Sequence, residues 1–398
     1  MPASYNREMD RHGRCATVYA TVLFIWCCAV QALPAEIRPS VWASTSISNL
    51  PIPTAGYQAY LIGELHGIQQ NEDFQLRYLA LLIRKTRLRD VAFEEKSVYE
   101  SAAQAYVAGR SPALPRELCL RAPLLQRIRR LNLHLAKSRR LRIHFVDLDS
   151  PAVAIREHLL EIRERLRGTS DVAIPAAGEI GTHGLSAVEQ LSGLHADSRT
   201  RSELRTVDHS IRALQQGFEV GVGPGKGSPY LEDREEAVAS NVADLLHGTN
   251  SPLLVIYGYD HVSRSMRNDG GPNRDQPFAP MALRLQRLGI RTFSLVVFPL
   301  RGRYFWRGRA GELPYTARDG QLESGETLDR VVASAPRAAY VYVDPRRQKI
   351  MLPSSDVSKY AVDAFLLVPV ATPVANPCPT EKATASRGNV RGVSPVTG

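Results

Sequence analysis

Cysteine is scarce in this chain of 398 residues, and most of it lies near the start. Three of the five cysteines, Cys15, Cys27 and Cys28, fall among the first 30 residues, which leaves Cys119 and Cys378. This scarcity excludes a disulfide-rich scaffold and a thiolate metal site. A single Cys119–Cys378 disulfide is left open, because a sequence cannot place two Cα atoms within bridging distance.

Aromatic residues are also few, at 7% of the chain, although the net charge is +10. The positive charge comes largely from arginines dispersed along the chain, such as Arg84, Arg127 and Arg139. Nucleic-acid binding needs a recognisable module, or basic residues interleaved with stacking aromatic side chains. The sequence has neither, so we expect no nucleic-acid partner. A generic attraction to anionic surfaces is left open.

No apolar run is long enough to predict a membrane span, which needs about 20 such residues. The nearest candidate runs from Ala16 to Val30, follows three arginines and ends in Val-Gln-Ala. This layout predicts a secretory signal peptide over residues 1–32, cleaved near Ala32 or Ala35. We therefore expect an exported protein, periplasmic or secreted, with no integral span after cleavage. A retained membrane anchor is the alternative.

The rest of the chain has the composition of a globular domain, with 44% hydrophobic and 23% charged residues overall. Short apolar runs alternate with segments in which apolar residues recur at helical spacing. This predicts one α/β domain over residues 50–375, with a central, largely parallel sheet flanked by helices and some surface insertions. The expected strands are 60–62, 91–93, 141–146, 252–257, 292–298, 339–343 and 365–370, and the expected helices are 71–84, 98–108, 124–137, 152–167, 202–217, 231–246 and 281–288.

Three stretches fall outside this alternation. Residues 169–193 carry four glycines and a weak apolar period, and are interpreted as an excursion over the surface. Gly221–Gly227 lacks the Gly-x-x-x-x-Gly-Lys-Ser/Thr order of a phosphate-binding loop, so a mobile loop or lid is expected there. Beyond Pro377 the composition turns to proline, threonine, serine and glycine, and residues 376–398 are expected to form a disordered tail.

Four polar clusters directly follow strand signals. Ligands of open α/β sheets bind beyond the carboxyl ends of the strands, so these clusters are candidates for a functional site. The Glu94–Glu95 pair suits acid–base work or cation binding, because neighbouring like charges raise one pKa. Each cluster alone could be a helix cap or an ion pair, whereas four together favour a site. They are Glu64 with His66, Glu94 with Glu95, Asp147 with Asp149, and His261 with Arg264.

The expected helix 231–246 carries polar residues on an apolar face. Arg234 and Asn241 lie seven residues apart, so they share one side of the helix with two valines. Polar side chains facing a core need polar partners there. We expect these partners to be the carboxylates Glu64 and Glu94.

These motifs, in this order, resemble a superfamily that includes erythromycin esterases, ChaN-type haem-binding proteins and Tiki/TraB-type proteins. Gly63-Glu64-Leu65-His66-Gly67 is similar to their Gly-Glu-x-His strand end. The likeness covers roughly residues 57–375. Val238-Ala239 departs from the usual Met-Ala, which puts a macrolide substrate in doubt. The other matches are Arg77 in the first helix, Glu94 after the second strand, Arg234 to Asn241, Gly258 to His261, and Asp363 to Pro373.

The resemblance implies a site lined by Glu64, His66, Glu94 and His261. In esterase members a histidine of the first motif activates water, in Tiki-type members similar residues hold a divalent metal, and ChaN-type members bind haem. Charge-orienting or substrate-orienting roles fall to Arg77, Arg234 and Asn241.

Four functions are therefore left open. In a hydrolase, His66 would activate water to attack an ester or peptide-type bond in a small-molecule or peptide substrate, and His261 or Arg234 would stabilise the oxyanion. In a metal-dependent version, the four site residues would hold Zn, Mn or Co. A protein that binds haem or another iron-containing ligand would use histidines and tyrosines at the mouth of the site, such as Tyr257 and Tyr259. An effector or structural protein with a decayed site is the last.

Overall fold

The compact unit that begins at Val41 contains nearly all the residues that the structure, a computed structural model, describes. The expected signal peptide, the loop 221–227 and the expected tail lie outside these residues. Cys119 is disulfide-bonded, but Cys378 also lies outside them, so the Cys119–Cys378 disulfide stays a prediction. No described helix is long and apolar enough to cross a membrane. The described ranges are 40–166, 171–194, 197–217, 229–268, 277–306, 309–313, 320–335, 340–351 and 361–375.

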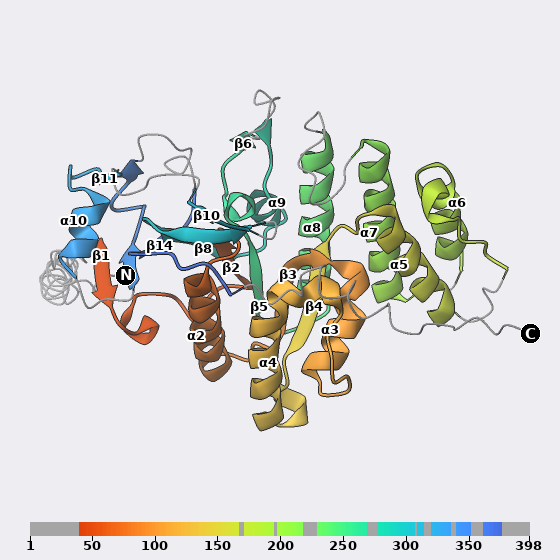
Figure 1. Ribbon diagram of the computed structural model, residues 1–398, viewed down its shortest axis with the longest axis horizontal. Helices are drawn as coiled ribbons and strands as arrows, with labels where there is room; N and C mark the ends of the chain where they lie inside the picture. Colours follow the sequence, from red (N-terminus) through yellow and green to blue (C-terminus); the bar gives the residue numbers. More distant parts are fainter. Residues whose placement is uncertain are drawn as a thin grey trace, which may run out of the picture. The chain divides into compact units, whose positions relative to one another are not determined.

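An eight-stranded sheet forms the centre of the fold (Figure 1). Its strands are β1 (Val41–Ser44), β2 (Ala59–Glu64), β3 (Asp90–Lys96), β4 (Arg142–Asp147), β5 (Leu253–Gly258), β8 (Thr292–Pro299), β12 (Tyr340–Val343) and β14 (Ala364–Val368). They lie in the order β1-β12-β14-β8-β2-β5-β3-β4. The six strands from β14 to β4 run parallel, whereas β12 is antiparallel to both of its neighbours. The prediction of an α/β domain with a largely parallel sheet is confirmed.

The described part of the chain also contains two-stranded ladders and α-helices. Three two-stranded ladders are β6 (Arg267–Asn268) with β7 (Pro277–Phe278), β9 (Arg303–Trp306) with β10 (Arg309–Glu312), and β11 (Gln321–Leu322) with β13 (Ile350–Met351). The α-helices are α2 (Gln69–Lys85), α3 (Glu100–Val107), α4 (Ala122–His134), α5 (Ala152–Arg165), α6 (Ile180–Ser192), α7 (Ser198–Gln215), α8 (Pro229–His247), α9 (Met281–Arg287) and α10 (Leu328–Ala333).

Helices cover both faces of the sheet, which is why the central strands are apolar on both sides. In β2, Tyr60 and Ile62 pack with α2, α3 and α4 in one cluster, while Ala59 and Leu61 pack with α8 and α9 in another. Figure 1 shows these two groups of helices on opposite sides of the sheet. Successive strand residues point to opposite faces, so every residue of β2 is buried.

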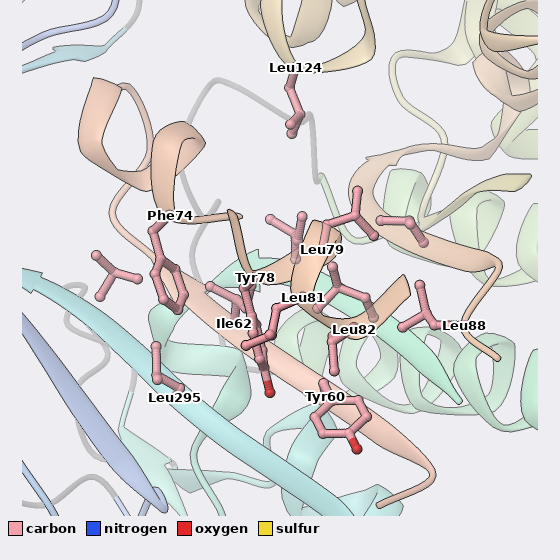
Figure 2. Packing of buried hydrophobic residues seen from close by; sticks show 14 of the residues in the cluster. Tyr60, Ile62, Phe74, Tyr78, Leu79, Leu81, Leu82, Leu88, Leu124 and Leu295 are labelled. Carbon is pink, nitrogen blue, oxygen red and sulfur yellow. The ribbon is translucent and has the colours of Figure 1, made fainter. Parts of the chain in front are cut away.

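The packing of α2 fixes the chain directly after β2. Phe74 stacks on Tyr78 with ring centroids 5.7 Å apart, and Tyr78 meets the edge of Tyr60 at 6.0 Å. Figure 2 shows these rings beside Ile62 and Leu295 of the sheet. The short loop between β2 and α2, which carries His66, is therefore held between two well-packed elements.

The interpretation of residues 169–193 as a surface excursion is wrong for the part that forms α6. The apolar residues of α6 recur at helical spacing and share a buried cluster with α5 and α7. Gly184 lies at a helix contact, because an added Cβ would stand 2.9 Å from Cδ1 of Ile211. This glycine permits close packing of two helices and does not mark a loop.

Candidate active site

Four neighbouring strands end at one cluster of charged side chains. β2, β5, β3 and β4 lie side by side and run parallel, so their carboxyl ends meet at one edge of the sheet. The structure thereby brings together Glu64, His66, Glu94 and His261. We call the full set the strand-end cluster, and its members are Glu64, His66, Glu94, Glu95, Arg121, Asp147, Arg234, Glu235 and His261.

Glu64 is the buried last residue of β2. Its Oε1 accepts hydrogen bonds from Nδ1 of His66 at 3.0 Å and from Nη1 of Arg121 at 2.8 Å, and its Oε2 accepts one from the Gln75 amide. Burial alone would raise the pKa of Glu64, but Arg121 and His66 outweigh it and lower the pKa to about 2. Glu64 is therefore ionised, and both of its oxygens are occupied.

His66 bridges two carboxylates. Its Nδ1 donates to Glu64, and its Nε2 lies 3.2 Å from Oε2 of Glu94 in an ion pair. Burial lowers the pKa of His66, but the attraction of Glu94 and the hydrogen bond to Glu64 outweigh this and raise the pKa to about 10. Each ring nitrogen faces a carboxylate oxygen, so the ring is an imidazolium at neutral pH.

The prediction that His66 acts as a general base does not fit this geometry. A base needs a lone pair that can take a proton, whereas both nitrogens of an imidazolium are already protonated. An imidazolium can instead donate a proton or stabilise developing negative charge. The His66 side chain is 28% exposed, against 13% or less for Arg121, Arg234 and His261. His66 is thus the cation of the strand-end cluster that solvent reaches best.

Arg234 enters the cluster from α8 and binds two carboxylates. Its Nε and Nη2 donate to the two oxygens of Asp147 at 2.8 and 2.6 Å, and Nη2 also donates to Oε1 of Glu94 at 2.7 Å. Nη1 lies 3.3 Å from Nε2 of His261. Of the two partners expected for this helix face, Arg234 therefore binds Glu94 and not Glu64. Asp147 takes the second place.

His261 follows β5 in a short 3-10 helix, Tyr259–Val262, and its ring is held by a residue of α8. Its Nδ1 is hydrogen-bonded to Glu235, whose other oxygen accepts from the backbone N–H of Met281 at 2.5 Å. Burial lowers the pKa of His261, but Glu235 outweighs it and the pKa is raised. Glu235 itself is fully buried, so this histidine is held by a charge with no access to solvent.

Arg77 does not take the orienting role that the resemblance implies. It lies on the exposed face of α2, whereas Gln75, two residues earlier, is buried and reaches Glu64. A helix turns about 100° per residue, so these two positions face different ways. Arg121, at the end of the 3-10 helix Arg116–Arg121, occupies the expected place. Its Nη1 donates to Glu64, and its Nε donates to Glu95 at 2.8 Å.

Asn241 orients the backbone and touches no carboxylate of the cluster. Its amide donates to the carbonyl oxygen of Val146 at 3.1 Å and to the hydroxyl of Thr206 at 2.9 Å, and both contacts are buried. The first contact holds β4 directly before Asp147. Asn241 therefore positions the carboxylate partner of Arg234 and acts on a charged group of the cluster through the backbone.

Two other predicted residues are structural. Asp149 accepts from Nδ1 of His158 at 2.6 Å and from the backbone N–H of Val98 at 2.9 Å, so it ties α5 to the end of β3. Arg264 donates to both oxygens of Asp363 at 2.8 and 2.7 Å, which fixes the start of β14.

The strand-end cluster does not fit a divalent metal. Such ions bind open carboxylate oxygens and unprotonated imidazole nitrogens. Glu64 and Glu94 already accept from arginine, histidine and amide donors, and both ring nitrogens of His66 face carboxylate oxygens. In the part of the chain that the structure describes, no group of three or more His, Cys, Asp or Glu side chains is arranged to hold a metal ion. Two guanidinium groups supply the positive charge instead.

Tyr257 does not lie at the mouth of the site, as a haem ligand would. It is fully buried in β5, and its hydroxyl has no hydrogen-bond partner among the described residues. Its ring lies under the guanidinium of Arg234, 5.5 Å from centroid to Cζ, and meets the edge of His261. Tyr257 thus supports the cluster from inside the core.

The loop that carries His66 is clamped by two other segments. Gly67 has a φ of +80°, and its carbonyl accepts from the N–H groups of Phe305 at 3.0 Å and Val374 at 3.1 Å. A Cβ at Gly67 would stand 1.8 Å from the carbonyl oxygen of Phe305. The backbone of β9 therefore approaches this loop as closely as glycine allows.

We expect Gly67→Ala to be clearly more destabilising than Gly56→Ala. Both glycines have a positive φ, but nothing lies within 4 Å of a Cβ at Gly56. Gly56→Ala should cost about 1–2 kcal/mol for the backbone conformation alone. The collision with Phe305 should add about 1–3 kcal/mol at Gly67. Urea unfolding of both variants measures the difference, and equal losses would show that β9 does not clamp the loop.

The sequence pattern of α2 could have indicated Gln75, whose side-chain amide donates to Glu64. Asn71 and Gln75 lie four residues apart on the buried face of α2, and they form the same kind of polar stripe as Arg234 and Asn241 on α8. Arg121 and Glu235 carry no such signal. Arg121 lies in a 3-10 segment without a helical period, and Glu235 simply follows another charged residue.

No family model and no curated protein matches this chain. Solved structures do match it. A crystal structure of a Bacillus cereus protein is 13% identical, with a TM-score of 0.59, over 80% of this chain and 90% of the other. A mutant of the erythromycin esterase EreC in its open conformation is 13% identical, with a TM-score of 0.60, over 81% and 93%. A succinoglycan biosynthesis protein is 12% identical, with a TM-score of 0.59, over 80% and 89%.

A ChaN protein of Campylobacter jejuni with cofacially bound haem is a weaker match. It is 12% identical, covers 61% of this chain and 81% of its own, and has a TM-score of 0.28, which is too low to indicate a shared fold. The likeness to erythromycin esterases, by contrast, is confirmed at the level of the fold: this chain shares its α/β architecture with EreC over most of both chains.

Proposed function

We propose that this protein is a hydrolase that adds water across an ester or peptide-type bond of a small molecule or peptide, with His66 as the proton donor of its active site. The position of His66 carries the proposal. It is an imidazolium held between two ionised carboxylates, and it is the cation of the strand-end cluster most open to solvent. The predicted export of the chain would place this activity outside the cytoplasm.

The chemistry of hydrolysis matches what His66 can do. Attack of water on a carbonyl places negative charge first on the carbonyl oxygen and then on the leaving oxygen or nitrogen. A fixed cation at that position stabilises the first charge, and its proton neutralises the second. His66 keeps its proton because Glu64 and Glu94 stay ionised. Burial alone would raise the pKa of both glutamates, but their cationic neighbours lower it.

The two arginines account for the ionised carboxylates. Arg121 lowers the pKa of Glu64, and Arg234, together with His66, lowers that of Glu94. Each arginine also binds a second carboxylate, Glu95 or Asp147, so neither can turn toward a substrate without breaking an ion pair. Stabilising the oxyanion therefore falls to His66 and not to Arg234.

The erythromycin esterase of the same fold supports the reaction class. The identity of 13% carries no substrate across, so the proposal names the bond and no macrolide. The test is a panel of ester and peptide substrates on the purified protein, with and without a chelator. We expect turnover of at least one ester at an unchanged rate in chelator, because the donor set of the cluster does not suit a divalent metal. Loss of turnover with chelator, restored by Zn, Mn or Co, would contradict the proposed chemistry.

A further inference from the structure

Hydrolysis also needs a group that takes a proton from water, and four carboxylates of the strand-end cluster are poorly placed to do so. Both oxygens of Glu64 accept hydrogen bonds, and so do both oxygens of Glu235. Glu94 accepts from Arg234 at Oε1 and from the backbone N–H of Gly258, 2.6 Å away, at Oε2. Arg234 binds both oxygens of Asp147. A proton taken by any of these carboxylates would remove its charge and weaken the hydrogen bonds and ion pairs that it already makes.

Glu95 differs from the other carboxylates in three respects. Its Oε1 accepts from Nε of Arg121, but its Oε2 accepts no hydrogen bond from any residue that the structure describes. Its side chain is 22% exposed, more than that of any other carboxylate of the cluster. Burial raises the pKa of Glu95 and outweighs Arg121, whereas the pKa of Glu64 and that of Glu94 are lowered.

A β-bulge explains how two successive glutamates serve one site. In a regular strand, Glu94 and Glu95 would point to opposite faces of the sheet. Phe93 pairs with Phe145, but the next pair is Lys96 with Asp147, so two residues of β3 oppose one of β4. Such bulges re-aim side chains at the edge of a sheet. Here Glu94 meets Arg234 while Glu95 meets Arg121.

Arg121 ties Glu95 to the proton donor. The same guanidinium donates to Glu95 and to Glu64, and Glu64 in turn orients His66. The carboxylate with an open oxygen and the imidazolium therefore belong to one connected set of hydrogen bonds. A water between them would have an acceptor on one side and a cation on the other.

We infer that Glu95 is the general base of this site, an inference that rests on the proposed function. Oε2 of Glu95 takes a proton from water as its oxygen attacks the carbonyl carbon. The tetrahedral anion collapses, the bond to the leaving oxygen breaks, and the leaving oxygen takes the proton of His66. Proton transfer from Glu95 to the neutral His66 restores both groups, and the carboxylic acid product releases its proton to water.

Glu72 is the natural comparison for Glu95. It lies in the first turn of α2, half-buried, and burial followed by the repulsion of Glu64 raises its pKa to about 7. No hydrogen bond or ion pair among the described residues orients its carboxylate toward the cluster. Glu72 is therefore a carboxyl group whose pKa is also raised but which lacks the anchoring that Arg121 gives Glu95.

The test uses p-nitrophenyl acetate as the probe ester and compares Glu95→Gln with Glu72→Gln. Glutamine keeps an oxygen for Arg121 but cannot take a proton, so Glu95→Gln should lower kcat on the order of 100-fold or more with little change in KM. Glu72→Gln should keep its turnover. Glu95→Ala should lose turnover too and regain part of it in sodium formate, which supplies a carboxylate. Thermal midpoints identify any variant that fails to fold.

The outcomes separate this inference from the proposed function. If the wild-type protein hydrolyses the probe and His66→Ala does not, but folded Glu95→Gln still does, the hydrolase stands and Glu95 is not its base. Loss of turnover in Glu95→Ala without rescue by formate would likewise overturn the inference and leave Glu95 a positioning residue for Arg121. If the wild-type protein does not hydrolyse the probe or any ester of the panel, the proposed function itself fails, and the inference fails with it.

Discussion

His66→Ala should lower turnover on an ester substrate on the order of 100-fold or more, the usual loss when a general acid is removed. The same change should leave the fold intact. Glu64 and Glu94 each keep an arginine, and the His66 side chain is part of a loop at the edge of the sheet. We expect a smaller loss of unfolding free energy than for His261→Ala, because both carboxylates that His66 contacts keep another cationic partner.

His261→Ala is the contrasting variant, measured for thermal midpoint and turnover on the same preparation. Loss of the His261 ring leaves the carboxylate of Glu235 buried without its imidazole partner, which typically costs about 3–5 kcal/mol of folding stability. A marked drop in thermal midpoint is therefore expected for His261→Ala and not for His66→Ala. If His66→Ala melts much earlier yet keeps its turnover once folded, His66 is scaffolding and the catalytic interpretation is wrong.

Arg234→Met should be among the most destabilising single substitutions in this fold. The guanidinium lies between the carboxylates of Glu94 and Asp147, and all three side chains are largely buried. Methionine fills similar volume but leaves the carboxylate of Asp147 buried without its arginine and close to that of Glu94, which keeps its contact with His66. Removing one partner of a buried ion pair costs about 3–5 kcal/mol, and urea unfolding should show a loss of that size.

Arg212→Met on α7 provides the matched control. Arg212 also binds a carboxylate, that of Asp208 at 2.7 Å one helical turn away, but the pair is exposed. Exposed pairs of this kind contribute less than about 1 kcal/mol, because water solvates both partners when they separate. Similar losses for the two variants would mean that the charges around Arg234 are solvated and that the strand-end cluster is not the buried network described above.

The fold could be predicted where an apolar pattern extends over many residues. The central strands are buried on both faces and therefore form near-continuous apolar runs, and helices such as α2 and α8 show a clear apolar face. β1 and the two-residue strands such as β6 are too short to show any period, so they were missed. The glycines of α6 resemble loop signals until the packing of Gly184 against α7 is seen.

The site could be predicted where its residues directly follow a strand. Glu64, Glu94 and His261 were found because parallel strands end at one edge. The protonation of His66 could not be found that way, because it depends on two carboxylates from different strands. Arg121 likewise reaches the cluster only through the tertiary placement of a short 3-10 segment.

The central claim is that His66 is an imidazolium in the folded protein. Its pKa is raised from the usual 6.5 to about 10. The stability that this shift provides is therefore fully present below the pKa of His66 in the unfolded chain. It is lost as the pH rises through the pKa of His66 in the folded protein. An NMR titration of the histidine ring signals, with His66→Ala for assignment, measures this directly. We predict that His66 keeps both ring protons between about pH 5 and pH 8, the range in which an ordinary histidine titrates. Loss of a proton near the usual 6.5 would contradict the account, because His66 would then be a neutral base and not the proton donor of the site.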